Sequence, residues 1–118
     1  MRENILKSKS YAFALRVVKL YKYLNDNKEY VLSKQLLRSG TAVGALVREA
    51  EFGQSKADFI SKLSIALKEA NETHYWLSLL RDSGYIDKKM YDSISPETEE
   101  LIRLLVSSIK TAKRNREK

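Results

Sequence analysis

The single histidine, His74, is the first residue in this sequence that could do chemistry. It follows two carboxylates, Glu69 and Glu72, in the segment EANETH. A di-iron or di-manganese helical bundle needs Glu-x-x-His pairs on two helices, and one histidine cannot supply them. The spacing of Glu72 and His74 also places them on different faces of a helix, which is wrong for a shared metal ion. We therefore expect a partly buried, hydrogen-bonded His74 and a protein that needs no metal and no cofactor.

Other catalytic arrangements also lack support in the sequence. A ribonuclease of the HEPN bundle type would place arginine and histidine a few residues apart on one helix, and no arginine lies shortly before His74. Serine, histidine and aspartate are all present, but without the sharp turn that exposes a nucleophilic serine. Cysteine is absent, which removes disulfides, thiolate nucleophiles and cysteine metal sites together. The sequence thus predicts a protein that is not an enzyme.

Basic residues offer a different chemistry, the binding of phosphate groups. The net charge is +7, and residues 1–22 hold six basic residues against one acidic residue, while residues 110–118 hold five against one. The stretch between them holds 11 basic and 13 acidic residues, so the positive charge gathers at the two ends of the chain. Such surfaces bind nucleic acids through phosphates, with an affinity that falls steeply with salt. The candidate nucleic-acid contacts are Arg16, Lys19, Lys22, Arg38, Arg48, Lys110, Lys113 and Arg114.

The spacing of apolar residues predicts an all-α protein with four long helices and no strand of comparable strength. Short connections favour an antiparallel up-down-up-down four-helix bundle, with the whole chain 1–118 as one domain. In that topology the first helix starts beside the end of the fourth, which would bring the two basic ends to one pole. The sequence leaves open whether the basic tail, residues 113–118, is ordered. The expected helices cover residues 8–24, 31–52, 55–83 and 95 to the tail, with 85–94 as a turn or a short separate helix.

Local signals mark three of the helix boundaries. Ser55 is expected to cap the third helix, with Asp58 three residues on as a variant of the capping box. Gly84 is expected to stop that helix, because glycine readily adopts the left-handed conformation that ends many helices. Ser95 at the N-cap and Pro96 in the first turn predict the start of the fourth helix. The signals therefore place a break in the chain between the third and fourth helices.

The sequence also carries expectations about the compartment. No stretch approaches the ~18 uninterrupted apolar residues of a membrane span. The N-terminal segment MRENILKSKSY has no apolar core of the signal-peptide kind. We therefore expect a protein of the cytoplasm.

Two glycines, Gly40 and Gly44, lie inside the expected second helix. Each costs roughly 1 kcal/mol relative to alanine, so a helix that accepts both needs a reason. Small residues four apart lie on one face and let a neighbouring helix approach closely. The alternative is a phosphate-binding glycine loop, but SGTAVG lacks the strand–loop–helix setting and the GxxxxGK[ST] pattern. We favour close helix packing over ligand binding at both glycines.

Apolar residues also lie away from the expected core faces. One line follows the first helix and another follows the third, and a monomeric bundle would leave much of both in water. Exposed single hydrophobic residues are normal, but two organised stripes favour self-association. The candidate oligomer interface comprises Tyr11, Leu15, Val18, Ile65, Trp76 and Leu79.

Three segments, QLLRSGTAVGALVREAE, SKADFISKLSIALKEANETHYWLSLL and EELIRLLVSSIKTAKRN, resemble one known family in the same order. They are similar to the bacterial four-helix-bundle proteins encoded in intervening sequences of 23S rRNA genes. That family includes the accessory variability determinant of diversity-generating retroelements. The residues that match its signatures in the second and third helices are Arg38, Ser39, Gly40, Gly44, Lys68, Glu69, Ala70 and Tyr75.

The resemblance implies an antiparallel four-helix bundle that assembles into a homopentameric ring. For the retroelement branch it implies a basic surface that binds nucleic acid and a partner reverse transcriptase. The family has no established catalytic residues, so the matching positions are interpreted as determinants of packing and assembly. The resemblance does not say which branch this chain joins.

Two functions remain in competition at this point. The first is a non-enzymatic homo-oligomer, a pentameric ring by the resemblance, that binds RNA or DNA through a basic surface and is accessory to a reverse transcriptase or related to rRNA. The second is a protein–protein scaffold whose charge is incidental. A bundle that holds a small molecule or metal would need a polar cavity, and the expected cores supply almost none.

Overall fold

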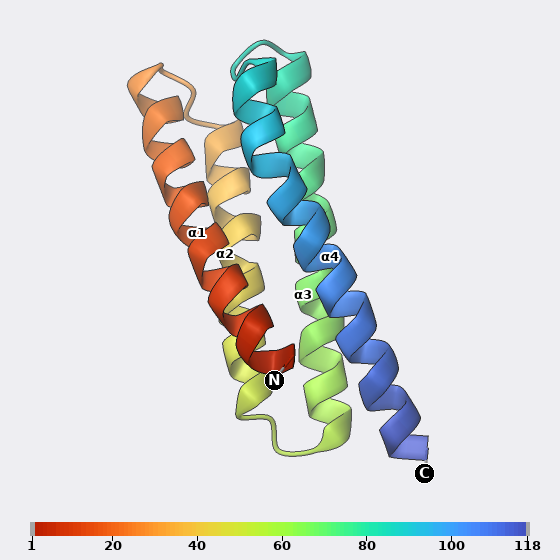
Figure 1. The fold of residues 1–118 in the computed structure, drawn as a ribbon. Coiled ribbons are helices and arrows are strands. Elements are labelled where there is room, and N and C mark those ends of the chain that lie inside the picture. Colours follow the sequence, from red (N-terminus) through yellow and green to blue (C-terminus); the bar gives the residue numbers. More distant parts are fainter. Residues whose placement is uncertain (1, 118) are drawn as a thin grey trace.

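The computed structural model describes residues 2–117, and their side chains from residue 5 to residue 115. The chain forms α1 (Arg2–Asp26), α2 (Leu32–Glu51), α3 (Lys56–Asp82) and α4 (Lys88–Glu117). Each helix packs against the helices before and after it, and α4 returns to contact α1. Figure 1 shows the resulting antiparallel up-down-up-down bundle, which confirms the predicted all-α fold. Neither strand nor bridge occurs among residues 2–117.

The core lies along the bundle axis, where each helix turns one apolar face inward. α1 starts at Arg2 rather than at the predicted Ser8, because Leu6 extends the buried face by two turns and is only 1% exposed. Burial of one large apolar side chain contributes about 1.5–3 kcal/mol, so this face holds α1 in place. The fully buried large residues include Phe13, Leu24, Leu36, Leu63, Leu77, Leu101 and Leu105.

The two glycines of α2 lie where α1 crosses closest. A Cβ atom added at Gly40 would lie 2.7 and 2.8 Å from the two methyl carbons of Val17. A Cβ atom at Gly44 would lie 3.2 Å from the carbonyl oxygen of Ser10. Both contacts involve α1, so the penalty of glycine inside a helix is offset by a close helix–helix approach. The packing interpretation of Gly40 and Gly44 is confirmed.

The predicted start of the fourth helix at Ser95 and Pro96 is wrong. α4 begins at Lys88, where the backbone N–H of Met90 donates to the Asp87 carboxylate at 2.8 Å. Ser95 is buried and helical, and Pro96 lies well inside the helix. A proline there removes one backbone hydrogen bond and costs about 3 kcal/mol. Tertiary packing outweighs that cost, since the segment just before the proline is buried against the core.

Two of the predicted boundary residues are confirmed. The Ser55 hydroxyl accepts a hydrogen bond from the backbone N–H of Asp58 at 3.0 Å, as expected of a helix cap. Gly84 has a φ of 85°, in the left-handed region. The backbone N–H of Tyr85 then donates to the carbonyl of Leu80 at 2.9 Å, which closes the last turn of α3.

The cap of α2 was missed in the sequence. The Glu29 carboxylate accepts hydrogen bonds from the backbone N–H groups of Leu32 and Ser33, at 2.9 and 2.7 Å. Burial raises the pKa of Glu29, but these backbone hydrogen bonds outweigh burial and hold the pKa below its usual range. Glu29 thus satisfies free N–H groups at the positive end of the α2 dipole.

The end of α1 repeats the geometry of Gly84 with a lysine in place of glycine. Lys28 has a φ of 66°. Its backbone N–H donates to Asn25 at 2.9 Å, and the N–H of Glu29 donates to Leu24 at 2.8 Å. A side chain in this conformation costs roughly 1 kcal/mol, because its Cβ crowds the following carbonyl.

Lys28→Gly is therefore expected to raise the free energy of unfolding by about 0.5–1 kcal/mol. The measurement is the urea midpoint at constant slope. Gly84→Ala provides the reciprocal control and is expected to lower stability by a similar amount, since open space surrounds that position. A loss of stability in Lys28→Gly would contradict the assignment of strain to this turn.

Candidate nucleic-acid interface

Residues 101–115 of α4 carry positive charge without any carboxylate among them. Residues 101–115 contain Arg103, Lys110, Lys113 and Arg114 and no aspartate or glutamate. All four side chains are exposed, and none of them forms an ion pair within residues 5–115. Cations near a helix C-terminus also interact favourably with the helix dipole. We call these four residues the basic end.

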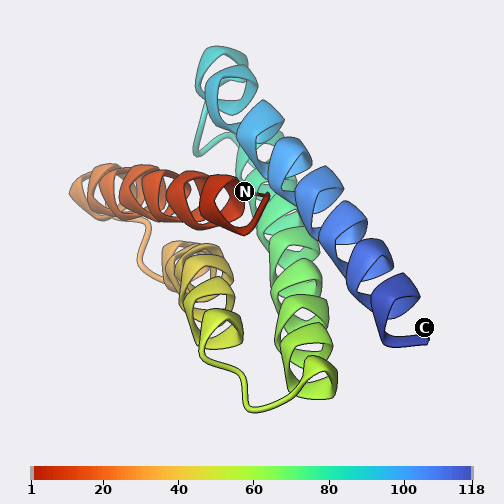
Figure 2. The same ribbon diagram turned by 60° about the horizontal axis from the view of Figure 1, so that its bottom comes forward.

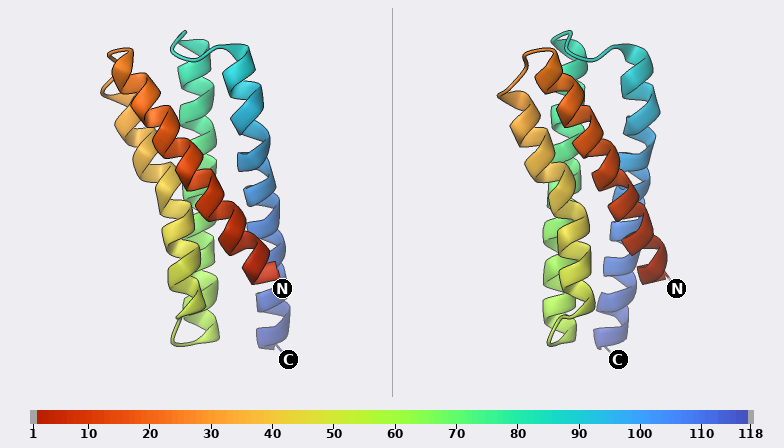
Figure 3. Two further views of the ribbon diagram at one scale, coloured as in Figure 1. Left: turned by 60° about the vertical axis from the view of Figure 1, so that its left-hand side comes forward. Right: turned by 90° about the vertical axis from the view of Figure 1, so that its left-hand side faces the viewer.

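Three residues of the basic end, Lys110, Lys113 and Arg114, belong to the last turns of α4, at the pole of the bundle where the chain begins and ends, whereas Arg103 lies near the middle of that helix. Figure 3 shows the N-terminus of α1 and the C-terminus of α4 at the same pole in both views. The start of α1 and the end of α4 therefore share one pole (Figure 3), but the expectation that the two basic ends meet there holds only in part, because half of the basic residues of 1–22 lie toward the other end of α1. Residues 113–117 continue α4 as helix, and residue 118 lies outside the described residues. Arg103 was not among the nucleic-acid contacts predicted from the sequence, although its spacing to Lys110 and Arg114 places all three on one side of the helix.

Three of the predicted contacts lie toward the other pole. Arg16, Lys19 and Lys22 belong to the last three turns of α1. At 1.5 Å per residue, Arg16 lies about 21 Å along the axis from the start of α1. Lys22 is still farther away. The positive charge of residues 1–22 is thus spread along the whole helix, and these three residues do not join the basic end.

Arg16 and Arg38 are both engaged by carboxylates of other helices. Arg16 pairs with Glu97 and donates to the backbone carbonyl of Ser93 at 2.9 Å. Arg38 pairs with Glu69 at 3.1 Å and with Glu72. A phosphate would have to displace these contacts, so both arginines contribute less to phosphate binding than the sequence suggests.

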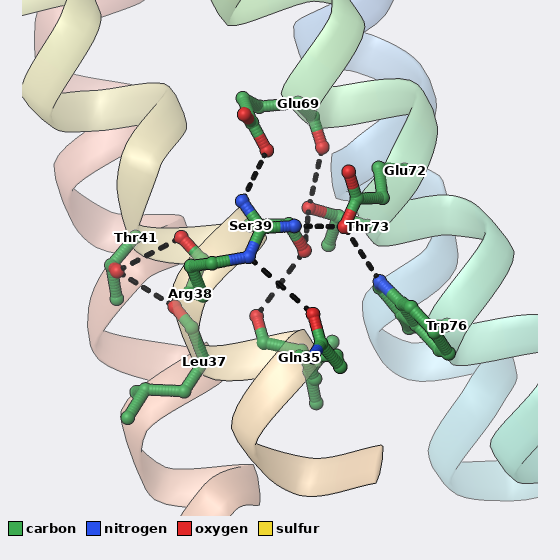
Figure 4. A network of polar contacts seen from close by, with 10 residues as sticks. Gln35, Leu37, Arg38, Ser39, Thr41, Glu69, Glu72, Thr73 and Trp76 are labelled. Atoms are coloured by element: carbon green, nitrogen blue, oxygen red, sulfur yellow. Dashed lines mark hydrogen bonds and ion pairs between the residues drawn. The ribbon is translucent and has the colours of Figure 1, made fainter.

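Arg38 belongs to a polar network that joins α2 to α3 (Figure 4). The indole N–H of Trp76 donates to Glu72 at 2.9 Å and is the largest cause of a lowered pKa at Glu72. Arg38 lowers that pKa further, against the opposing effect of burial. Behind this network the Thr73 hydroxyl donates to the buried Ser39 hydroxyl at 3.0 Å. Three of the matched positions, Arg38, Ser39 and Glu69, therefore join α2 to α3.

Arg48 is the predicted contact of α2 that stays exposed and outside any ion pair among residues 5–115. It lines a groove of about 310 Å³ between α1 and α2, beside Tyr11 and Gly44. Tyr11, which also lines this groove, is 57% exposed. Arg48 lies in the half of α2 nearer the pole of the basic end, since α2 runs toward that pole (Figure 1).

The candidate oligomer residues divide by exposure. Tyr11 and Leu15 are each 57% exposed, and Ile65 is 42% exposed. The other three, Val18, Trp76 and Leu79, are half-buried. Among residues 2–117, no Cα atoms of α1 and α3 come within 8 Å of each other, so the two helices lie diagonally across the bundle and their outer stripes are on different sides.

His74 is half-buried and hydrogen-bonded, as predicted. Its Nε2 lies 3.3 Å from the hydroxyl of Tyr91 and 3.9 Å from the carboxylate of Glu99. The Tyr91 hydroxyl also lies 3.3 Å from Ser78, and this hydrogen bond is the largest cause of a lowered pKa at Tyr91. These contacts join α3 to the first half of α4.

No helix in the described part of the chain combines the length and the apolar character needed to cross a membrane.

The family described as 23S rRNA-intervening sequence protein matches residues 2–107. A crystal structure from Bacteroides thetaiotaomicron, of a protein with unknown function from the S23 ribosomal protein family, superposes with a TM-score of 0.91. The two sequences are 58% identical, and the alignment covers 93% of this chain and 99% of that one. No match is found among curated proteins. The match over residues 2–107 shows that the chain belongs to the 23S rRNA-intervening sequence protein family.

Proposed function

We propose that this protein is a non-enzymatic, homo-oligomeric nucleic-acid-binding protein that contacts phosphates through the basic end. The observation that carries the proposal is the charge of residues 101–115, where four exposed cations face solvent without a carboxylate among them. Opposite charges usually pair along a solvated helix, as Lys88 and Asp92 do at the other end of α4. A run of unpaired cations on one helix is the electrostatic footprint of a phosphate-binding surface.

Self-association would multiply this surface. Tyr11 and Leu15 on α1 and Ile65 on α3 are exposed, and α1 and α3 lie diagonally across the bundle, with no Cα atoms of their described residues within 8 Å of each other. Two different apolar patches on one molecule suit a head-to-tail contact between subunits. Such contacts form a closed ring when the rotation from one subunit to the next is a whole fraction of a full turn. A pentameric ring, as the resemblance implies, would present five basic ends about one axis. Modest phosphate contacts then become collectively strong.

The family description directs the choice of nucleic acid. It names the intervening sequence of 23S rRNA, so we propose RNA from such an insertion as the first ligand to test. Neither comparison names a reverse transcriptase, and that partnership stays a prediction.

The deciding experiment titrates labelled single-stranded and double-stranded RNA and DNA with the protein at two salt concentrations. We expect binding at ~50 mM salt and a loss of roughly a hundredfold or more at ~200 mM, because several phosphate contacts release counterions. Absence of binding at ~50 mM would contradict the proposal and favour the protein–protein scaffold. Sedimentation of the same sample tests assembly, and a monomer would contradict the ring.

A further inference from the structure

A trough lies between α1 and α4 near the pole opposite the basic end. The two helices approach each other near the start of α1 and diverge toward the end where α1 stops and α4 begins (Figures 2 and 3). The trough has a volume of about 400 Å³. It is lined by Arg16, Lys19, Leu20 and Tyr23 from α1 and by Lys89, Met90, Ser93 and Ile94 from α4.

The floor and the rim of the trough differ in chemistry. Leu20 and Ile94 are buried at the floor, and Met90 is half-buried beside them. Tyr23 adds an aromatic ring that is 41% exposed. Every ionisable side chain that lines the trough, apart from the tyrosine, is basic. A ligand that fits this surface has an apolar body and a negative charge.

The two lysines are the cations available to such a ligand. Lys19 on α1 and Lys89 on α4 are exposed, and neither forms an ion pair within residues 5–115. Arg16 is already occupied by Glu97 and Ser93. An anionic group placed between the helices would therefore be recognised by Lys19 and Lys89.

The shape of the trough favours a compact ligand over a polymer. At one end of the trough Arg16 bridges α1 and α4 through its contacts with Glu97 and Ser93, and a polymer that continued past this end would have to cross that bridge. From Arg16 to Tyr23 the trough spans about 10 Å of α1, at 1.5 Å per residue. Its volume lies within the roughly 300–1,000 Å³ of small-molecule sites, which are mostly apolar with a few placed polar groups.

We propose that the trough binds a small organic anion with an aromatic body, whose ring packs against Tyr23, Met90 and Leu20 and whose acidic group meets Lys19 and Lys89. Aromatic rings pair favourably edge-to-face or offset, which suits a ligand ring beside Tyr23. The site is separate from the basic end, so it does not depend on nucleic-acid binding.

The test uses 8-anilino-1-naphthalenesulfonate as an anionic probe and N-phenyl-1-naphthylamine as its neutral counterpart. Fluorescence titration of the native protein is expected to show saturable binding of the sulfonate. The double variant Lys19→Gln, Lys89→Gln is expected to weaken sulfonate binding about tenfold, as for the loss of about 1.4 kcal/mol. Binding of the neutral probe should not change in that variant. Met90→Glu is expected to weaken both probes at least tenfold, because it places a carboxylate beside the apolar floor.

The matched control is Lys110→Gln, Lys113→Gln, which makes the same change of charge at the basic end. It should leave both probes bound as in the native protein. Circular dichroism melting verifies that each variant is folded. If Met90→Glu unfolds, the lysine variants still test the proposal, because they leave the apolar floor unchanged. The proposal is overturned if the native protein does not bind the sulfonate, or if the two lysine double variants weaken it equally.

Discussion

Gly40→Leu is expected to lower the free energy of unfolding by about 3 kcal/mol, the upper part of the range for overpacked cores. Even the first added carbon would lie 2.7 Å from a methyl group of Val17, and Val17 is itself fully buried. A β-branched side chain has few alternative rotamers inside a helix, so Val17 cannot turn away. The two helices must separate instead. The gain in helix propensity from replacing glycine, about 0.7 kcal/mol, is too small to offset this.

Urea unfolding of the variant and the native protein measures the effect. Ala45→Leu is the matched control, because it adds a leucine to the same helix at an exposed position. It should change stability by less than about 0.5 kcal/mol. A second check combines Gly40→Ala with Val17→Ala, where the added methyl group fills part of the space that the valine leaves. Additive losses in that pair would contradict direct contact between the two positions.

The second large effect concerns the basic end. Reversing three charges, with Lys110→Glu, Lys113→Glu and Arg114→Glu, is expected to weaken binding of RNA about a hundredfold or more at ~50 mM salt. Each lost phosphate contact reduces the steepness of the plot of log affinity against log salt concentration by about one. The magnitude of this slope should therefore decrease by about three. The three residues are exposed and outside the core, so the variant is expected to stay folded.

A control with the same change of charge separates a local surface from overall charge. The control is the triple variant Lys22→Glu, Lys28→Glu, Lys34→Glu. Its three lysines are exposed and lie toward the pole opposite the basic end. This triple variant should lose much less affinity than the triple variant of the basic end. Equal losses would mean that net charge, and not the basic end, governs binding. Unchanged binding in the first variant would reject this surface as the phosphate contact.

Local signals in the sequence were sufficient where one residue acts on its own turn of helix. Ser55 and Gly84 were both located correctly, because a cap needs only a side chain or a φ value that the residue type favours. The prediction at Pro96 was wrong because it, too, considered only the local sequence. A serine–proline pair is a strong local start signal, but the burial of Ile94 and Ser95 joins the preceding turns to α4. That burial depends on packing against other helices, which local sequence does not encode.

At the candidate site, too, local sequence was sufficient for some properties and insufficient for those that depend on other helices. In the sequence all eight cations looked alike. In the structure Arg16 reaches Glu97 on α4, and Arg38 reaches Glu69 and Glu72 on α3, over sequence separations of 81, 31 and 34 residues. No short-range pattern indicates such pairs. The trough between α1 and α4 was not expected either, because it results from the angle between two helices that are far apart in the chain.

The sequence by itself determined the four helices, their antiparallel order and the meeting of the chain ends, since apolar periodicity and short connections act locally. It also determined that Gly40 and Gly44 admit a neighbouring helix. Only the tertiary structure decided which cations stay unpaired and where a trough opens. Those properties depend on distances between residues on different helices, and such distances are set by how the apolar faces pack.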